Sequence, residues 1–385
     1  MNDARRSWLK SAAALSSWSL VELFTARCSP RSAWAWQQGG AASSGDAAGR
    51  DSKAGRDAKS GRDAKSSGAG RGGVDMLPRT IDAVRKGLEF LARAQNDDGS
   101  FGSGLYSRNV GVCSLAGLAW MSAGSTPGRG PHGARVNRVL EFVLGCCQES
   151  GFITHAGSTS HGPMYEHGFA TLFLAEAYGM SPQPALRARL ARAVKLIVDK
   201  QNDEGGWRYA PERRDADISV TICQVMALRA ARNAGLFVPT ETINRCVDYV
   251  KRSQNSDGGF MYQLSAGGPS KFPRSAAGIV ALHSAGVYDG EELRRGLEYL
   301  MQNAPTKAMV AVENHYFYGQ YYAAQAMWQA GGDWWRRWYP AVESDLVSRQ
   351  EESGSWSDSI SPAYGTAMAC IILQMPRNHL PIFQK

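Results

Sequence analysis

The chain has 385 residues, 43% of them hydrophobic, and a formal net charge of +8. Residues 1–73 hold 12 basic against 6 acidic residues, which leaves 31 basic against 29 acidic residues in the remainder. Because the excess positive charge lies outside the part with a folding pattern, these counts exclude a basic nucleic-acid-binding surface on the folded domain. No stretch after the first 35 residues has the roughly 18 uncharged apolar residues that a membrane-spanning helix needs, so we expect no transmembrane segment.

The first two segments of the chain carry a targeting pattern and a linker pattern. Residues 1–35 begin with the pair Arg5-Arg6, continue through a modestly apolar stretch and reach the A-x-A site Ala33-Trp34-Ala35. This order is typical of a twin-arginine export signal and predicts a periplasmic or extracellular protein, although an ordinary amphipathic helix is the alternative. Residues 36–74 consist mainly of Gly, Ala, Ser, Arg, Asp and Lys, a composition that predicts a disordered linker.

From residue 75 onward the sequence repeats itself. Near copies of one motif start at Gln95, Gln148, Gln201, Gln254 and Gln350, with a degenerate copy at residue 302, and the steps are roughly fifty residues each. An amphipathic helical pattern precedes each copy, and a shorter, more uniformly apolar helical pattern follows it. Residues 75–385 are therefore expected to form six helix pairs in an all-α domain.

Six helix pairs can stack as an open solenoid or close into a ring. An open stack needs end repeats with a polar outer face, whereas the second helix of the first repeat and that of the last repeat are as apolar as the middle ones. We therefore expect closure into a single (α/α)6 barrel with the apolar helices as its inner ring. The repeated glutamine, glycine and aromatic residue are expected to join neighbouring pairs, since each can satisfy or permit backbone groups at a helix end.

The motif resembles the QW repeat of squalene and oxidosqualene cyclases. Gln201, Gly205 and Trp207 match it, as do Gln350, Gly354 and Trp356, while the copies at 95 and 254 have Phe in place of Trp. The resemblance implies an α/α toroid of the terpenoid cyclase and protein prenyltransferase group over residues 75–385. Triterpene cyclases of this group use two toroids, however, and this chain has one.

The same resemblance points to one acidic motif. Triterpene cyclases protonate their substrate with the middle Asp of D-x-D-D, and here Asp215-Ala216-Asp217-Ile218 keeps the first two acids and replaces the last by Ile. Asp217, helped by Asp215, is therefore a candidate proton donor, and a plain helix N-cap is the alternative. The zinc site of prenyltransferases needs a D-x-C sequence that does not occur in this chain, so we expect neither zinc nor another cofactor.

Two further groups of residues are candidates for ligand contact. One connection and helix start holds Tyr165, Glu166 and His167, close to His155 and His161; these residue types bind zinc or exchange protons, but their spacing matches no metal signature. The second group lies on an inner helix, where aromatic faces can stabilise cations, stack on sugars or contact isoprenoids; packing in the core is the alternative. It comprises Tyr318, Tyr321, Tyr322 and Gln325, with Glu313, His315 and Tyr316 at the helix start.

Six cysteines outside the signal segment lie mostly in apolar helical patterns, with no C-x-x-C pair, and are expected to be buried free thiols. Three functions remain open. The first is a terpenoid-cyclase-like enzyme that binds or converts a polyprenyl or other lipidic substrate in the lumen. The second is a non-catalytic binding or interaction module, and the third is a carbohydrate-active lyase or hydrolase, since function depends on the site more than on the fold. The sequence does not identify a partner protein.

Overall fold

The computed structural model describes residues 76–102, 104–158, 160, 162–304 and 315–384. The expected export signal at 1–35 and linker at 36–74 lie outside these residues, as do His161 and Glu313. In the described part of the chain, no helix is long and apolar enough to span a membrane.

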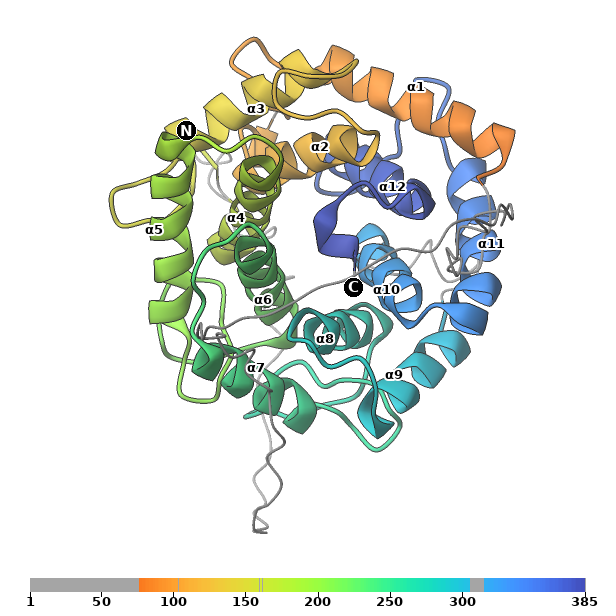
Figure 1. Ribbon diagram of the computed structural model, residues 1–385. Coiled ribbons are helices and arrows are strands. Elements are labelled where there is room, and N and C mark those ends of the chain that lie inside the picture. Colours follow the sequence, from red (N-terminus) through yellow and green to blue (C-terminus); the bar gives the residue numbers. More distant parts are fainter. Residues whose placement is uncertain (1–75, 103, 159, 161, 305–314, 385) are drawn as a thin grey trace, which may run out of the picture. The chain divides into compact units, whose positions relative to one another are not determined.

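The described residues form twelve α-helices, with three short 3-10 helices and isolated β-bridges but no extended strand. The helices alternate along the chain between an outer and an inner ring, as Figure 1 shows. The outer ring comprises α1 (Pro78–Ala94), α3 (Gly133–Gly145), α5 (Pro184–Lys200), α7 (Thr240–Arg252), α9 (Glu291–Gln302) and α11 (Gly332–Ser348). The inner ring comprises α2 (Val110–Ser122), α4 (Pro163–Met180), α6 (Ile218–Asn233), α8 (Phe272–Ser284), α10 (Tyr316–Ala330) and α12 (Pro362–Leu373).

Residue pattern decides which ring a helix joins. Every residue of α2 is buried, and so is every residue of α12 after Pro362, because these helices are enclosed on all sides. In α1 the buried residues recur at intervals of three or four, from Thr80 to Leu91, which is one face of an α-helix. Proline occupies the first turn of α4, α8 and α12, where its missing N–H has no partner to lose.

The ring of helix pairs is closed, as the uncapped ends of the repeat predict. Each inner helix packs against the next, and α12 packs against α2, so the last inner helix adjoins the first (Figure 1). The outer ring closes in the same way, since α1 packs against α11 and the Gln350 amide donates a 2.8 Å hydrogen bond to the carbonyl of Ala83. An open solenoid is excluded for these residues.

The glutamine of the QW motif joins consecutive outer helices, and the tryptophan binds the end of the outer helix before it. The amide of Gln201 donates to the carbonyl of Gly205 in its own turn and to that of Thr242 in the next outer helix, both at 2.9 Å. Gln95, Gln254 and Gln350 make the equivalent pair of bonds. The indole of Trp207 folds back to donate to Ile197 near the end of α5, which satisfies a carbonyl that the helix leaves without a partner. The motif therefore has a structural function.

The glycine of the motif permits a close approach of two backbones. Gly205 has a φ of 102°, and a Cβ atom there would lie 2.2 Å from the carbonyl oxygen of Arg245 in α7. The sequence pattern predicts that this glycine ends the outer helix. In the structure α5 has already ended at Lys200, and Gly205 instead shapes the turn that follows. The left-handed conformation is as expected, but it serves contact with the next helix.

The second repeat aligns with the others one residue earlier than its sequence match at Gln148 suggests. The N–H of Asn202 donates to the carbonyl of Gly206, and the equivalent bond in the second repeat runs from Gln148 to Phe152. Gln148 is thus the counterpart of Asn202, which places Cys147 at the glutamine position and Ile153 at the aromatic position. The match of Gln148 to the repeated glutamine is therefore wrong, and Gln148 is exposed.

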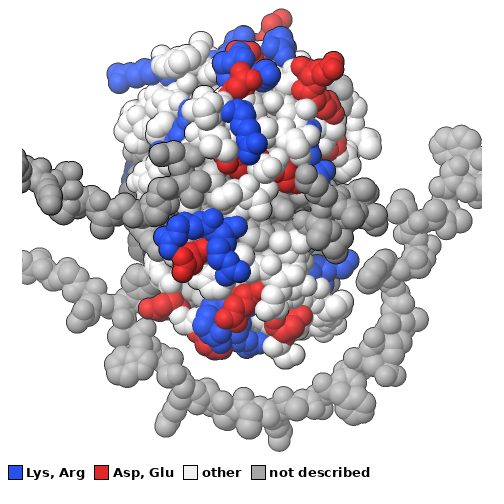
Figure 2. Space-filling view, turned by 90° about the vertical axis from the view of Figure 1, so that its right-hand side faces the viewer, with Lys and Arg blue, Asp and Glu red and all other residues white. Residues whose placement is uncertain are grey.

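The outer surface carries charges of both signs. Figure 2 shows basic and acidic side chains interspersed over the face it presents. Many of them are paired within one turn of an outer helix, for example Arg85 with Asp82 and Glu89 in α1, and Arg336 with Asp333 in α11. This mixed pattern agrees with the near-neutral charge of residues 74–385.

Candidate functional site

The candidate site lies where the inner helices begin, in the stretch that leads into α6. Asp217 is the N-cap of α6, and its Oδ1 accepts hydrogen bonds of 2.9 Å from the backbone N–H groups of Ser219 and Val220. Its side chain is fully buried. Asn109 and Ser361 cap α2 and α12 in a comparable way, so the capping bonds of Asp217 are a recurring structural feature.

Arg208, which no sequence pattern distinguishes, connects the two candidate acids. Arg208 Nη1 lies 2.9 Å from Oδ2 of Asp217, and its Nε lies 3.1 Å from Oδ2 of Asp215. Asp215 is about half exposed and also accepts a 3.2 Å bond from Gln263. Both carboxylates are therefore brought together by one guanidinium, which lies at the mouth of the inner ring with a side-chain exposure of 23%.

Burial of Asp217 and the hydrogen-bond partners of its carboxylate act on its pKa in opposite directions. Burial raises the pKa, and it outweighs the backbone donor of Val220, the Arg208 guanidinium and the donor of Ser219, which lower the pKa, so the net value is about 6. At neutral pH the carboxyl is consequently mostly ionised, and both of its oxygens are engaged. A proton donor for an acid-initiated reaction must instead be protonated, so the neutral-pH state of Asp217 is that of a cap and ion-pair partner.

Four tyrosines form a continuous group of which two contact Arg208, and we call them the tyrosine mouth: Tyr165, Tyr209, Tyr262 and Tyr318. All four are half-buried. The Arg208 guanidinium lies 4.3 Å from the ring centre of Tyr209 and 5.3 Å from that of Tyr262, and it donates a 3.0 Å bond to the Tyr262 hydroxyl. The hydroxyls of Tyr209 and Tyr262 are bonded to each other.

The remaining two tyrosines of the mouth come from inner helices. The ring of Tyr165 in α4 lies 6.0 Å from that of Tyr209 and 6.5 Å, edge to face, from that of Tyr318 in α10. The Tyr318 hydroxyl donates 3.0 Å to the carbonyl of Ser219, next to the cap of α6. The mouth therefore joins α4, α6 and α10 with the two connections that precede α6 and α8.

Below the mouth, the other predicted residues of α10 are buried. Tyr321 and Tyr322 are at most 1% exposed, and the Tyr322 hydroxyl lies 3.3 Å from the sulfur of Cys223 in α6. Gln325 donates to the carbonyl of Tyr321 in its own helix. These three side chains pack in the interior, and the Tyr322 ring supports the mouth from below, edge to face with the Tyr318 ring at 4.8 Å.

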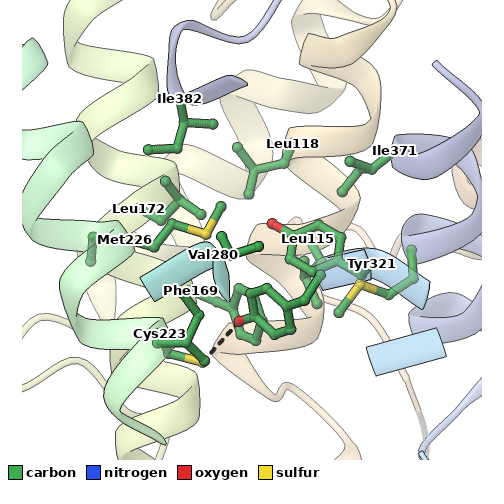
Figure 3. Close-up of a cluster of buried hydrophobic side chains, with 14 of the residues drawn as sticks. Leu115, Leu118, Phe169, Leu172, Cys223, Met226, Val280, Tyr321, Ile371 and Ile382 are labelled. Carbon is green, nitrogen blue, oxygen red and sulfur yellow. Dashed lines mark hydrogen bonds between the residues drawn. The ribbon is translucent and has the colours of Figure 1, made fainter. Parts of the chain in front are cut away.

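The axis of the inner ring is filled by apolar side chains, which we call the axial core. Figure 3 shows these side chains converging from all six inner helices and from the C-terminal segment, and none is more than 6% exposed. Its labelled members are Leu115, Leu118, Phe169, Leu172, Cys223, Met226, Val280, Tyr321, Ile371 and Ile382. Two hollows of about 420 and 370 Å³ lie elsewhere, and no residue of the axial core or tyrosine mouth lines either one.

The described histidines of the cluster, His155 and His167, form no metal site. His167 is buried and its Nδ1 accepts a 3.2 Å bond from the N–H of Ile153, just as Thr221 accepts from Trp207 in the next repeat. Burial lowers the pKa of His167 to about 4, so the imidazole is neutral at pH 7. Its bond to Ile153 connects α4 to the turn that follows α3. His315 is exposed, with a φ of 77°, at the start of α10.

Glu166 lies beside the Ser158 hydroxyl, 3.3 Å from it, and burial raises the pKa of its carboxyl. No group of three or more His, Cys, Asp or Glu side chains in the described part of the chain is arranged to hold a metal ion. The six described cysteines are free thiols, as their apolar surroundings predict. Of the candidate residues, the structure thus brings together Asp215, Asp217, Tyr165 and Tyr318.

Comparisons with known proteins agree with this architecture. Residues 77–208 match the prenyltransferase alpha-alpha toroid domain, and residues 173–311 match the squalene-hopene cyclase C-terminal domain. The chain thus contains an α/α toroid similar to both of these domains, and the resemblance of its repeats to the terpenoid cyclase and prenyltransferase group is confirmed. A search of curated proteins gives no significant match.

Solved structures share the fold at low sequence identity. One is a variant of the type II terpene cyclase MstE from Scytonema with geranylgeranyl dihydroxybenzoate, at 13% identity and a TM-score of 0.55, covering 78% of this chain and 98% of that one. Another is a glycoside hydrolase family 76 mannosidase from Bacteroides thetaiotaomicron, at 10% identity and a TM-score of 0.58, covering 77% and 98%. An alpha-amylase from Clostridium perfringens has 8% identity and a TM-score of 0.54, covering 76% and 97%. At these identities the likeness establishes the fold alone.

Proposed function

We propose that this toroid is a ligand-binding module whose ligand contacts the tyrosine mouth, and that it does not carry out acid-initiated cyclisation at neutral pH. This proposal rests on the hydrogen bonds and the ion pair that occupy both carboxylate oxygens of Asp217. Its Oδ1 holds the start of α6 and its Oδ2 holds Arg208, so no carboxylic proton faces a ligand. The axial core supports the same conclusion, since its buried side chains fill the lumen in which a lipidic substrate was expected.

The chemistry of the mouth favours a sugar as ligand. Half-buried tyrosines offer flat apolar faces beside hydroxyl groups, and Arg208, Asp215 and Gln263 add donors and acceptors at the same place. Such surfaces suit a ligand with one apolar face and many hydroxyls. The mannosidase and amylase that share the fold support this choice, because a closed helical toroid also serves proteins that act on sugars.

Calorimetric titration with mannotriose and maltotriose tests the proposal. We expect the full chain to bind one of them, and Tyr165→Ala and Tyr262→Ala each to weaken binding by about tenfold through loss of a stacking face. Tyr288→Ala is the control, because this exposed tyrosine lies outside the mouth. Binding of a dispersed prenyl alcohol at the mouth, with no response to either sugar, would overturn the sugar assignment. An altered covalent structure of either ligand after incubation would overturn the non-catalytic assignment.

A second function has one observation in its favour. Because burial raises the pKa of Asp217 to about 6, half of the carboxyls are protonated at that pH. The match to the squalene-hopene cyclase C-terminal domain and the lipidic substrate of MstE favour a polyprenyl compound as the substrate of such an acid. Incubation with a geranylgeranyl-bearing compound at pH 5, followed by mass spectrometry and chromatography, distinguishes this function: an isomeric product that Asp217→Asn does not form would establish it. Export directed by residues 1–35 remains a prediction that belongs to either function.

A further inference from the structure

The end of the inner ring opposite the tyrosine mouth is occupied by the C-terminal segment 380–384. Leu380, Ile382 and Phe383 are 1%, 4% and 3% exposed, and the short helix η3 (Pro381–Phe383) packs against α6 and α10. In Figure 1 this segment turns into the middle of the inner ring. Figure 3 shows Ile382 directed at Leu118, Leu172 and other members of the axial core. The segment therefore occupies an apolar chamber formed by the inner helices.

Three side-chain donors converge on the carbonyl oxygens of this segment, and we call them the donor cup. Arg229 Nη2 donates 2.7 Å to the carbonyl of Gln384, while Trp328 Nε1 and Gln329 Nε2 donate 3.1 and 2.9 Å to the carbonyl of Phe383. All three donors are at least nine-tenths buried. A set of buried donors that converges on oxygen atoms beside an apolar chamber is suited to an amphiphile with an oxygen-bearing head.

The guanidinium in the donor cup has no charged partner in the described part of the chain. Arg229 is 6% exposed and donates to the carbonyls of His283 and Gln384, but no ion pair joins it to a carboxylate. The nearby Glu176 accepts a 3.4 Å bond from the N–H of Ile382, and burial raises its pKa to about 8, so it is mostly neutral at pH 7. Buried arginines are normally paired with an anion. The donor cup therefore favours an anionic head group.

Few backbone bonds hold the C-terminal segment in place. Phe383 bonds to Leu380 and Gln384 bonds to Pro381, both at 3.0 Å and both within the segment. Its links to the ring are the side-chain donors of the cup, the Glu176 contact and apolar packing. Terminal segments held in this way open at a lower free energy than the helices around them, so the segment can leave while the toroid stays folded.

We propose that the C-terminal segment is an internal occupant of a binding site for a long-chain carboxylate. The carboxylate of the ligand contacts Arg229, Trp328 and Gln329, and its hydrocarbon chain takes the place of Ile382 and Phe383 against the axial core. This site is separate from the tyrosine mouth, and it does not depend on the function proposed there.

Fluorescence titration of the full chain with cis-parinaric acid and with its methyl ester tests this site. We expect the acid to bind at least tenfold more tightly than the ester, since a hydrogen bond to a charged group is worth that much. Ile382→Gln, which weakens the apolar fit of the segment, is expected to tighten binding of the acid several-fold. Arg229→Gln is expected to abolish the preference for the acid, and Arg232→Gln, an exposed arginine on the same helix, is the matched control.

Hydrogen exchange on the wild-type chain provides a measurement that needs no variant. Saturation with the acid is expected to speed exchange of the Ile382 and Phe383 amides at least tenfold, while the amides of α6 and α10 stay protected. Absence of binding by both the wild type and Ile382→Gln would overturn the proposal. Equal affinity for acid and ester, or binding with no change at residues 380–384, would also overturn it.

Discussion

Replacement of Asp217 by Asn separates the cost of burying this carboxylate from its function as a helix cap. Asn caps a helix about as well as Asp, so the bonds to Ser219 and Val220 are kept while the charge is lost. The pKa of the buried carboxyl is raised from its ordinary 3.8 to about 6. Its contribution to stability is therefore fully present below pH 3.8 and is lost as the pH rises through 6. The full change, from well below pH 3.8 to well above pH 6, is about 3 kcal/mol.

Guanidinium unfolding of the wild type and of Asp217→Asn at pH 4 and pH 7 measures this contribution. The free energy of unfolding of the wild type, relative to the variant, is expected to fall by about 2 kcal/mol between the two pH values, because the unfolded carboxyl is already more than half ionised at pH 4. Asp215→Asn is the control, because this half-exposed carboxylate binds the same Arg208. A wild type that gains stability over the variant as the pH rises would refute the reasoning, since the ion pair and backbone donors would then outweigh burial.

Two further predictions concern the joints between repeats. Gly205→Ala is expected to lower the free energy of unfolding by at least about 2 kcal/mol, because the new Cβ meets a backbone carbonyl at a φ of 102°. Gly179→Ala is the control, since this exposed helical position has its nearest contacting atom at 3.9 Å. This second substitution should leave the free energy of unfolding unchanged or raise it. Cys147→Gln is expected to raise the free energy of unfolding by about 1 kcal/mol, because the new amide reaches the carbonyls that correspond to those bound by Gln201. Chemical denaturation measures the change, with Gln148→Ala at an exposed position as the control. A loss of stability in Cys147→Gln, or the same gain in Gln148→Ala, would contradict the assigned register.

The fold could be predicted because each joint uses the same short-range chemistry. A glutamine, a glycine and an aromatic residue recur at four of the joints between outer helices, and the bonds of Gln201 and Trp207 show what the glutamine and the aromatic residue do there. Ring closure could also be predicted from the sequence, since neither the first nor the last inner helix has a polar face. The sequence of the second repeat is misleading about its register, because Gln148 matches the glutamine of the motif while backbone bonds place Cys147 at that position.

The filling of the axis could not be predicted from the sequence. A helix that faces a ligand cavity and one that faces other side chains are both apolar all round, as α2 and α12 are. The contact of Arg208 with Asp217 was missed for a related reason, since a long side chain in a connection can reach many places and only the path of the chain selects one. Tyr318 and Tyr322 lie one helical turn apart, yet one belongs to the mouth and the other to the interior.

One recurring position does connect the repeats to the candidate site. Tyr209 lies two residues after Trp207, and Tyr262 lies two residues after Phe260, so neighbouring repeats present equivalent side chains whose hydroxyls meet. His155 follows Ile153 by the same interval once the register of the second repeat is corrected. Because the aromatic position itself is used for the joint, its chemistry is constrained, whereas the position two residues later is free to vary with the ligand. If a ligand contacts the tyrosine mouth as we propose, homologous toroids with other ligands should differ at this position while they keep the aromatic residue of the joint.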